Sequence, residues 1–288
     1  MKVTVTGAAG RLGSATVRAL VAHGYDVHAT DRSYRKDLPC PLDIANLLDA
    51  PSCYRLVEGA DVLLHLGNHP GVWRSGEAGT YAENCTMNIN IIQAALEVGV
   101  KKIAFASSIQ VMAGHRRRGD GPYPPSALAY LPADGDMPTN ATNVYSLSKK
   151  ACEDLLAVLA RTRGLQTVAV RFPLLVGEHS RRWMRHPWSD YDALDEAFAY
   201  LAVDDAAELL AAIAAADLPG FRIYLPAGPG NLLRKAPSEI IHEYYPDVPL
   251  RKPLAQLEAL VDISRITADT GWTPKQDIFG AAEASHAA

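Results

Sequence analysis

The stretch "NVYSLSKKACEDLL", residues 143–156, places Tyr145 and Lys149 four positions apart. Residues at i and i+4 share one face of an α-helix, so this spacing brings a phenol and an ammonium group together. A free phenol has a pKa of about 10 and is a poor base at neutral pH. A neighbouring positive charge favours the phenolate and lowers that pKa. The pair therefore predicts a general acid–base at Tyr145, supported by Lys149, if other segments build a site around it.

A second candidate site is the turn "TGAAGRLG", in which Gly7, Gly10 and Gly13 stand three residues apart. The run before it predicts a strand at 2–6, and the amphipathic run after it predicts a helix at 11–24. In such a turn the glycines permit a tight bend, close approach of a pyrophosphate, and close packing of helix on strand. The N–H groups and dipole of the helix N-terminus favour that negative charge. We therefore expect a dinucleotide to bind at this turn.

Asp31 ends the next predicted strand, 26–31, and lies 24 residues after Gly7. A carboxylate there accepts hydrogen bonds from the adenosine ribose hydroxyls and repels a 2′-phosphate, so we expect NAD. Arg32 follows directly and can pair with a phosphate, which keeps NADP open as an alternative cofactor.

Strand patterns and helix patterns alternate along the first part of the chain. Further strands are predicted at 60–67, 101–108 and 166–172, and helices at 80–99 and 145–163. This alternation indicates an α/β fold with a parallel sheet covered by helices on both faces. Segment 109–143 is rich in Pro, Gly and short polar residues, and it predicts a long functional loop.

The pattern loosens after residue 172. It predicts a helix at 203–217, a strand at 221–228, and short helices at 238–245 and 264–271. We expect a Rossmann-type doubly wound parallel sheet with a small C-terminal substrate lobe. The expected division is a dinucleotide-binding core at 1–172, a substrate lobe interleaved with the core at 173–280, and a flexible tail at 281–288.

Composition narrows the class of protein. The chain has 288 residues, of which 48% are hydrophobic, and a net charge of −4, which argues against a general nucleic-acid binder. Its 4 cysteines form no Cys-x-x-Cys pair, and its 9 histidines show no metal-binding spacing. The opening "MKVTVTG" is not a signal peptide, and we find no apolar run near 20 residues in length. We expect a cytoplasmic protein with no metal, nucleic-acid or membrane partner.

A series of segments in order resembles the extended short-chain dehydrogenase/reductase family, which includes the NAD-dependent epimerases and dehydratases. The resemblance covers almost the whole chain. Its segments are "TGAAGRLG", "PLDIAN", "LLHLG", "VKKIAFASSIQVM", "YSLSK", "YLAVDDAAELL" and "DTGWTPK".

The resemblance implies a catalytic triad of Ser108, Tyr145 and Lys149. Tyr145 would take a hydroxyl proton as hydride leaves the same carbon for the nicotinamide, while Ser108 would hold the reacting oxygen. Lys149 would also hold the nicotinamide ribose. The cofactor-binding residues that the resemblance implies are Gly7, Gly10, Arg11, Leu12, Gly13, Asp31, Arg32, Asp43, Ile44, Leu66, Gly67, Asn84, Tyr145, Lys149 and Pro173.

Departures from the family pattern bear on the substrate. Ile109 and Gln110 stand where the family's dehydratases carry an Asp-Glu pair, which argues against dehydration. Leu174, in "RFPLLVG", replaces an Asn with which nucleotide-sugar members contact a phosphate. The segment "RRWMRHPWSD", 181–190, faintly resembles one that supplies a carboxylate-binding arginine in uronate dehydrogenases. The predicted substrate contacts are His69, Ser108, Gln110, Arg181, Arg182 and Arg185.

Three functions are compatible with these motifs. The first is an NAD-dependent oxidoreductase that acts on a hydroxyl of a sugar, sugar acid or polyol, and Leu174 and the short C-terminal part favour it. The second is a nucleotide-sugar epimerase that keeps its NAD tightly bound. The third is a non-catalytic dinucleotide sensor, against which the presence of both Tyr145 and Lys149 argues. The resemblance also implies a homodimer formed through the helices at 79–98 and 145–163.

Overall fold

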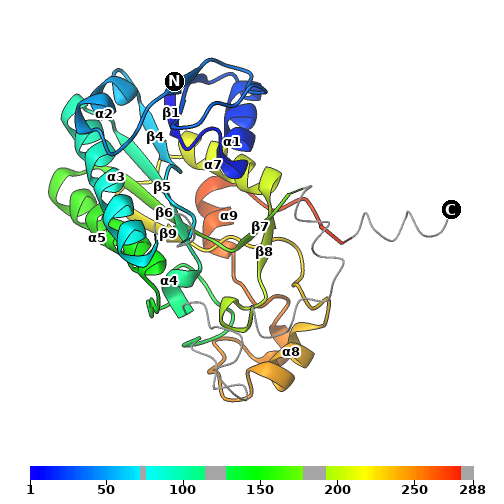
Figure 1. Cartoon of the computed structure of the whole chain (residues 1–288). Coiled ribbons are helices and arrows are strands. Elements are labelled where there is room, and N and C mark those ends of the chain that lie inside the picture. Colours follow the sequence, from blue (N-terminus) through cyan, green and yellow to red (C-terminus); the bar gives the residue numbers. More distant parts are fainter. Residues whose placement is uncertain (72–75, 114–127, 178–192, 280–288) are drawn as a thin grey trace.

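The chain is described by a computed structural model that covers residues 1–71, 76–113, 128–177 and 193–279. Its centre is a parallel sheet with the strand order β3-β2-β1-β4-β5-β6-β9 (Figure 1). The order runs outward in both directions from β1 and β4, which is the doubly wound arrangement of a Rossmann-type fold. The predicted fold class is confirmed. The strands are β1 (Lys2–Thr6), β2 (Asp26–Asp31), β3 (Leu42–Ile44), β4 (Val62–His65), β5 (Lys102–Ser108), β6 (Gln166–Phe172) and β9 (Phe221–Tyr224).

Helices cover both faces of the sheet. On one face α1 (Arg11–Ala22) packs against α7 (Val203–Ala215), and on the other α2 (Ala50–Val57), α3 (Gly76–Val98) and α5 (Val144–Arg163) lie side by side (Figure 1). Strands buried on both sides need apolar side chains at most positions. Accordingly, all four residues of β4 are buried, and only His65 among them is polar. Because β1, β4 and β5 are neighbouring parallel strands, their carboxyl ends lie at one edge of the sheet.

Helix α5 carries the Tyr–Lys pair, and residues at both of its ends define where it begins and stops. The Asn143 side chain accepts a hydrogen bond from the Ser146 N–H at 2.8 Å, and Ser146 returns the bond in a capping box. Gly164 ends the helix in the left-handed conformation, with φ at 65°. The buried face includes Lys149 and Cys152. This agrees with the helix predicted at 145–163.

Several short elements were not predicted. The segment expected to be a loop at 109–143 contains the helix α4 (Gln110–Ala113), and the strand expected at 221–228 ends at Tyr224. The unpredicted strands β7 (Leu174–Val176) and β8 (Tyr200–Ala202) pair with each other in parallel. Runs of three or four residues are too short for a periodic pattern, so pairing with distant segments decides their conformation.

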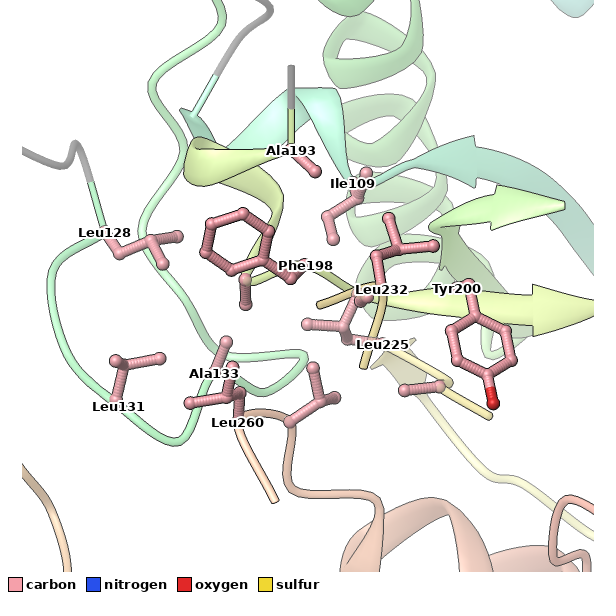
Figure 2. Close-up of a cluster of buried hydrophobic side chains, with 14 of the residues drawn as sticks. Ile109, Leu128, Leu131, Ala133, Ala193, Phe198, Tyr200, Leu225, Leu232 and Leu260 are labelled. Carbon is pink, nitrogen blue, oxygen red and sulfur yellow. The ribbon is translucent and has the colours of Figure 1, made fainter. Parts of the chain in front are cut away.

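The segments after residue 172 contribute to two hydrophobic cores. Helix α7 and strand β9 belong to the sheet layer, where Leu209 and Tyr224 join the core that α1 lines. A second cluster, which we call the lobe cluster, surrounds Phe198 and draws on distant segments (Figure 2). Its labelled members are Ile109, Leu128, Leu131, Ala133, Ala193, Phe198, Tyr200, Leu225, Leu232 and Leu260. The division of the chain at 172 stays a prediction.

The remaining helices of the described residues lie in the second half of the chain and are short. They are η1 (Leu194–Glu196), α8 (Pro237–Tyr244), η2 (Leu254–Gln256) and α9 (Ser264–Thr270). Among the residues that the structure describes, none of the helices has the length and apolarity needed to cross a membrane.

Candidate active site

The glycine turn is built so tightly that side chains would not fit. Gly7 adopts φ +69°, and a Cβ atom there would lie 2.8 Å from the Gly67 nitrogen. A Cβ atom at Gly13 would lie 2.0 Å from the Gly7 carbonyl oxygen. Leu66 and Gly67, which follow β4, are thereby held against the turn, as the prediction of a shared cofactor site requires.

The N-terminus of α1 fits a pyrophosphate. Its N-cap, Gly10, is exposed and supplies no side-chain cap, and the first turn, which lies wholly within the described residues, holds no acidic residue. Backbone N–H groups at such an end are available to an anion. Arg11 is exposed, and its Nη1 atom donates a hydrogen bond of 3.0 Å to the Leu175 carbonyl oxygen of β7. Leu12 is partly buried against the core below.

Asp31 lies beside this turn at the end of β2. Its two carboxylate oxygens accept hydrogen bonds from the backbone N–H groups of Ala9, at 3.1 Å, and Ser33, at 2.8 Å. Arg32, the next residue, is exposed. Sequence reasoning missed Arg35, whose Nη1 atom donates to the Ala9 carbonyl oxygen at 3.1 Å.

Asp43 and Ile44 lie on β3, next to β2. Asp43 forms an ion pair with Arg55 and lies 3.5 Å from the Nε2 atom of His28. Ile44 is 50% exposed, which leaves its side chain available to a flat apolar group such as adenine. The predicted roles of Asp43 and Ile44 in cofactor binding stay predictions.

Ser108, Tyr145 and Lys149 meet at the carboxyl end of β5. Hydrogen bonding from the Ser108 hydroxyl lowers the pKa of Tyr145, and the Lys149 Nζ atom lies 5.7 Å from the centroid of the Tyr145 ring. Lys149 is buried, and its Nζ atom donates to the Ala106 carbonyl oxygen at 2.8 Å and to Asn68 at 2.9 Å. The three residues predicted as a triad therefore lie together.

Without a bound cofactor, burial dominates the pKa values of Tyr145 and Lys149, and the lowered Tyr145 pKa expected beside an oxidised nicotinamide stays a prediction. Burial raises the pKa of Tyr145 to about 12, and the hydrogen bond from Ser108 opposes this shift only in part. Burial also lowers the pKa of Lys149 to about 7, so its side-chain amine is only partly protonated at neutral pH. Desolvation disfavours both charged forms and outweighs the attraction between them in the protein without a cofactor.

A chain of buried polar groups extends behind Lys149. Asn68 donates to the Oδ1 atom of Asn88 at 2.9 Å, and that same oxygen lies 2.9 Å from the Nε2 atom of His65. The other ring nitrogen of His65 lies 2.8 Å from the hydroxyl of Thr6 on β1. Burial lowers the pKa of His65 to about 4, so its ring is neutral. The network links β1 and β4 to α3 and α5, and the sequence did not reveal it.

Asn84 and His69 form a separate contact at the same edge. The Asn84 side chain accepts from the His69 backbone N–H at 2.8 Å and donates to the Ser148 hydroxyl at 3.0 Å. His69 is buried, and its ring pairs with Glu83. Asn84 thus holds the loop after β4 onto α5. Direct contacts of Asn84 with a cofactor and of His69 with a substrate stay predictions.

A buried ion pair supports the end of β5 from below. Arg171 on β6 and Glu153 on α5 are each 2% exposed and form two hydrogen bonds, at 2.9 and 3.0 Å. Glu153 also accepts from the Ser107 hydroxyl at 2.6 Å. The remaining Arg171 nitrogen donates to the Met137 carbonyl oxygen at 2.8 Å. We call Arg171, Glu153 and Ser107 the buried brace, because they tie the helix of Tyr145 to the sheet.

Gln110 begins α4, two residues beyond Ser108. Its Oε1 atom accepts a hydrogen bond of 3.4 Å from Asn143, the N-cap of α5. Gln110 also lowers the pKa of Glu196 by hydrogen bonding, which only partly offsets the rise caused by burial; sequence reasoning missed Glu196 because it lies far along the chain. Pro173 is buried between β6 and β7. The predicted substrate contacts Arg181, Arg182 and Arg185 lie outside the described residues.

Comparison with known proteins gives sugar dehydrogenases, nucleotide-sugar epimerases and reductases as relatives. The chain is 28% identical over 198 residues to the uronate dehydrogenase of Pseudomonas syringae pv. tomato, a match that covers 67% of this chain and 66% of that protein. It is 29% identical over 179 residues to the L-arabinose 1-dehydrogenase (NAD(P)(+)) of Haloferax volcanii, covering 61% of this chain and 67% of that protein. The match to the uronate dehydrogenase thus spans slightly less than two thirds of that relative's length.

A solved structure of UDP-glucose 4-epimerase from Bifidobacterium longum, in complex with NAD+ and UDP, has the same fold. It superposes with a TM-score of 0.69 at 22% identity, covering 96% of this chain and 95% of that one. The family model that describes the NAD dependent epimerase/dehydratase family matches residues 3–224, a span that includes the glycine turn, the Tyr–Lys pair and residues of every strand of the parallel sheet. With most of its length inside that match, this chain belongs to the NAD dependent epimerase/dehydratase family.

Proposed function

We propose that the protein is an NAD-dependent dehydrogenase that oxidises a hydroxyl of a free sugar, sugar acid or polyol. The observation that carries this proposal is the meeting of Ser108, Tyr145 and Lys149 at the sheet edge that also holds the glycine turn. The names of two relatives, a uronate dehydrogenase and an arabinose dehydrogenase, support the class of substrate.

Each member of the triad has one task. Tyr145 takes the proton of the substrate hydroxyl, and Ser108, at the end of β5, holds the same oxygen in line. Lys149 reaches the site from the buried side and binds the nicotinamide ribose. When bound, oxidised NAD supplies the hydride acceptor, and its positive charge favours the phenolate of Tyr145.

The remaining cofactor contacts follow from the glycine turn outward. The N–H groups at the start of α1, with Gly10 as an uncapped N-cap, hold the pyrophosphate. Asp31 exchanges its present backbone N–H partners for the adenosine ribose hydroxyls, which favours NAD over NADP. Ile44, half exposed on β3, covers the adenine.

A nucleotide-sugar epimerase is the second candidate, because it uses the same triad and because the Bifidobacterium epimerase shares the fold. Leu174 argues against it, since this apolar side chain on β7 offers no hydrogen bond to a phosphate. The expected arginine contact with a substrate carboxylate, through Arg181, Arg182 or Arg185, favours an acid such as a uronate.

We further propose a homodimer in the cytosol. Helices α3 and α5 lie together on one face and expose apolar side chains, which a second copy of the chain would cover. These are Tyr81, Ile89 and Val98 on α3, and Leu147 and Val158 on α5, each at least 40% exposed. Sedimentation equilibrium measures the oligomeric state, and a monomer at micromolar concentration would contradict the proposal.

The test of the proposed activity is a cofactor-reduction screen. The purified protein is mixed with NAD and, in turn, with uronic acids, matched neutral sugars, polyols and nucleotide sugars, and NADH is followed by absorbance. We expect NADH with a free sugar or sugar acid. Conversion of nucleotide sugars without net NADH would instead identify the epimerase. Replacement of the responsible arginine by Ala should raise the KM for acids roughly ten- to a hundredfold and leave neutral sugars unchanged.

A further inference from the structure

Asn68 provides a hydrogen-bond acceptor for the amine of Lys149. Its Oδ1 atom accepts from the Lys149 Nζ atom at 2.9 Å, and the Ala106 carbonyl oxygen accepts from the same atom at 2.8 Å. The Nζ atom also lies 4.6 Å from the centroid of the Phe105 ring, whose face favours a positive charge. An ammonium group has three N–H donors, so two fixed acceptors leave one donor and set its direction.

The amide of Asn68 is held in one orientation. Its Nδ2 atom donates to the Oδ1 atom of Asn88 at 2.9 Å, so its oxygen is the atom that faces Lys149. The Asn88 oxygen only accepts, and therefore the Nε2 atom of His65, also at 2.9 Å, carries the ring hydrogen. The Nδ1 atom of His65 then accepts from the Thr6 hydroxyl at 2.8 Å. An inverted Asn68 amide would place donor against donor at Lys149 and acceptor against acceptor at Asn88.

This chain of side chains is anchored on the backbone of the cofactor site. The Thr6 hydroxyl oxygen accepts from the N–H groups of Leu66 and Gly67, at 3.1 Å each. Gly67 in turn lies against Gly7 of the glycine turn. The side chains behind Asn68 in the chain are almost fully buried, so each is held in its place. Amide side chains neither gain nor lose protons near neutral pH, so the chain orients its members and does not relay protons.

We propose that Asn68 is a positioning residue for Lys149: its oxygen holds the amine as an ammonium group and turns the remaining N–H toward the nicotinamide ribose. Through the chain behind Asn68, the glycine turn thereby helps to place the group that binds the nicotinamide end of the cofactor. The inference rests on the proposed dehydrogenase function, in which Lys149 binds that ribose, and it adds a residue outside the catalytic triad.

Lys149 is the group beside Asn68 that titrates near neutral pH. Burial lowers the pKa of Lys149 to about 7, whereas it raises the pKa of Tyr145 to about 12 and lowers that of His65 to about 4. Burial also raises the pKa of the Cys152 thiol on α5. The side chains that α3 and β5 contribute here are an amide and a phenyl ring, which do not ionise. Because a hydrogen bond to the charged form favours it, loss of the Asn68 oxygen should lower the pKa of Lys149 further.

The test measures the ionisation of Lys149 directly. Protein isotope-labelled at the lysine Cε carbons is titrated and followed by NMR, and the Lys149 signal is the one absent from Lys149→Met. In Asn68→Leu, which removes the oxygen at nearly the same volume, the titration midpoint should fall by roughly one pH unit or more. In Asn68→Asp, which supplies a carboxylate, the midpoint should rise. A purely structural role of Asn68 would not move the midpoint in opposite directions.

NADH affinity links this ionisation to cofactor binding. At pH 7 the protonated fraction of Lys149 falls roughly fivefold when its midpoint falls from about 7 by one pH unit. NADH should therefore bind to Asn68→Leu roughly fivefold more weakly than to the wild type, because less of the amine is in the form that holds the ribose. Fluorescence titration with NADH measures this difference without any substrate.

Gln166→Met is the matched control. Gln166 also uses both atoms of its amide, since its Nε2 atom donates to Asp217 at 2.6 Å and its Oε1 atom accepts from the Leu218 N–H at 3.0 Å. It begins β6, so it lies at the edge of the sheet opposite the triad. Its replacement should leave the Lys149 midpoint and NADH affinity unchanged. Thermal unfolding establishes that each variant is folded, and if Asn68→Leu does not fold, Asn68→Asp carries the comparison.

The outcomes separate the inference from the proposed function. Unchanged Lys149 midpoints in the Asn68 variants would overturn the inference, and so would a lowered midpoint in Asn68→Leu that leaves NADH affinity at the wild-type value. Neither measurement uses a sugar. Failure of the wild type to oxidise any free sugar, sugar acid or polyol would therefore contradict the proposed function without changing either result.

Discussion

The Nζ atom of Lys149 lies 2.9 Å from the Oδ1 atom of Asn68, to which it donates a hydrogen bond. Asn68 follows β4, whereas Lys149 is on α5, so the bond joins the loop beside the glycine turn to the helix of Tyr145. With the Ala106 carbonyl oxygen as a second acceptor, it holds a buried ammonium group whose charged form is disfavoured. The site thus keeps an amine near its ionisation midpoint before any cofactor binds.

This state of Lys149 predicts a specific dependence of stability on pH. The pKa of Lys149 is about 7 in the folded protein, whereas that of an exposed lysine is 10.5. Between these values the unfolded chain binds a proton that the folded chain does not, so stability rises with pH. Relative to Lys149→Met, the wild type should gain roughly 1 kcal/mol per pH unit between about pH 7 and 10. Urea unfolding at neutral and at mildly alkaline pH measures this difference, and equal slopes for the two proteins would contradict it.

Removal of the phenol hydroxyl should separate binding from chemistry. In Tyr145→Phe the ring still fills its place on α5, so NAD affinity should stay close to that of the wild type. Turnover should fall roughly a hundredfold or more, the usual effect of losing a general acid–base. NADH fluorescence titration and steady-state kinetics measure the two quantities. Wild-type turnover in Tyr145→Phe would remove Tyr145 from the mechanism.

Replacement of Gly13 by Ala should disrupt the turn itself. The added Cβ atom would lie 2.0 Å from the Gly7 carbonyl oxygen, so α1 must move away from β1 and the pyrophosphate site must open. We expect loss of measurable NAD binding and a large fall in the midpoint of thermal unfolding. Gly24→Ala is the control, because Gly24 has φ +79° but no atom within 4 Å of its Cβ position. It should cost only about 1–2 kcal/mol and leave NAD binding intact.

Asp31 should determine the choice between the two nicotinamide cofactors. Its carboxylate lies beside the glycine turn, bound to the N–H groups of Ala9 and Ser33, where it would hold a ribose and repel a phosphate. We expect the wild type to bind NAD more tightly than NADP. Asp31→Ala should narrow that difference in affinity, because the carboxylate that both holds the ribose and repels the phosphate is removed. Calorimetry with both cofactors tests this. A wild type that prefers NADP would show that Arg32 outweighs Asp31.

The parts of the site that could be predicted are those encoded within one element or one turn. Gly7, Gly10 and Gly13 stand at fixed spacing between a strand and a helix, and Tyr145 and Lys149 are one helical turn apart. Ser108 was found because it ends a strand. Each of these signals is local, so it can be recognised without knowledge of the fold.

The parts that were missed depend on long-range pairing. Helix η1, which carries Glu196, packs on α4, and no pattern around residue 196 predicts this contact. Strand β7 exists only because Leu174 and Tyr200 come together in register. In the protein without a cofactor, burial raises the pKa of Tyr145, which was missed because sequence spacing reveals the neighbouring amine but not the depth of burial; the lowering expected with oxidised nicotinamide bound stays a prediction. Desolvation is a property of the folded whole.

The buried brace restricts how this sequence can vary. Removing either Arg171 or Glu153 would leave an uncompensated charge in the interior, a loss of about 3–5 kcal/mol, whereas an apolar pair of similar volume can replace such an ion pair at little cost. A single substitution at either position is thus strongly destabilising, whereas simultaneous replacement of both residues costs little stability. In a combinatorial library selected for folding, these two positions should therefore covary as one unit, with Ser107 as their third, more permissive member.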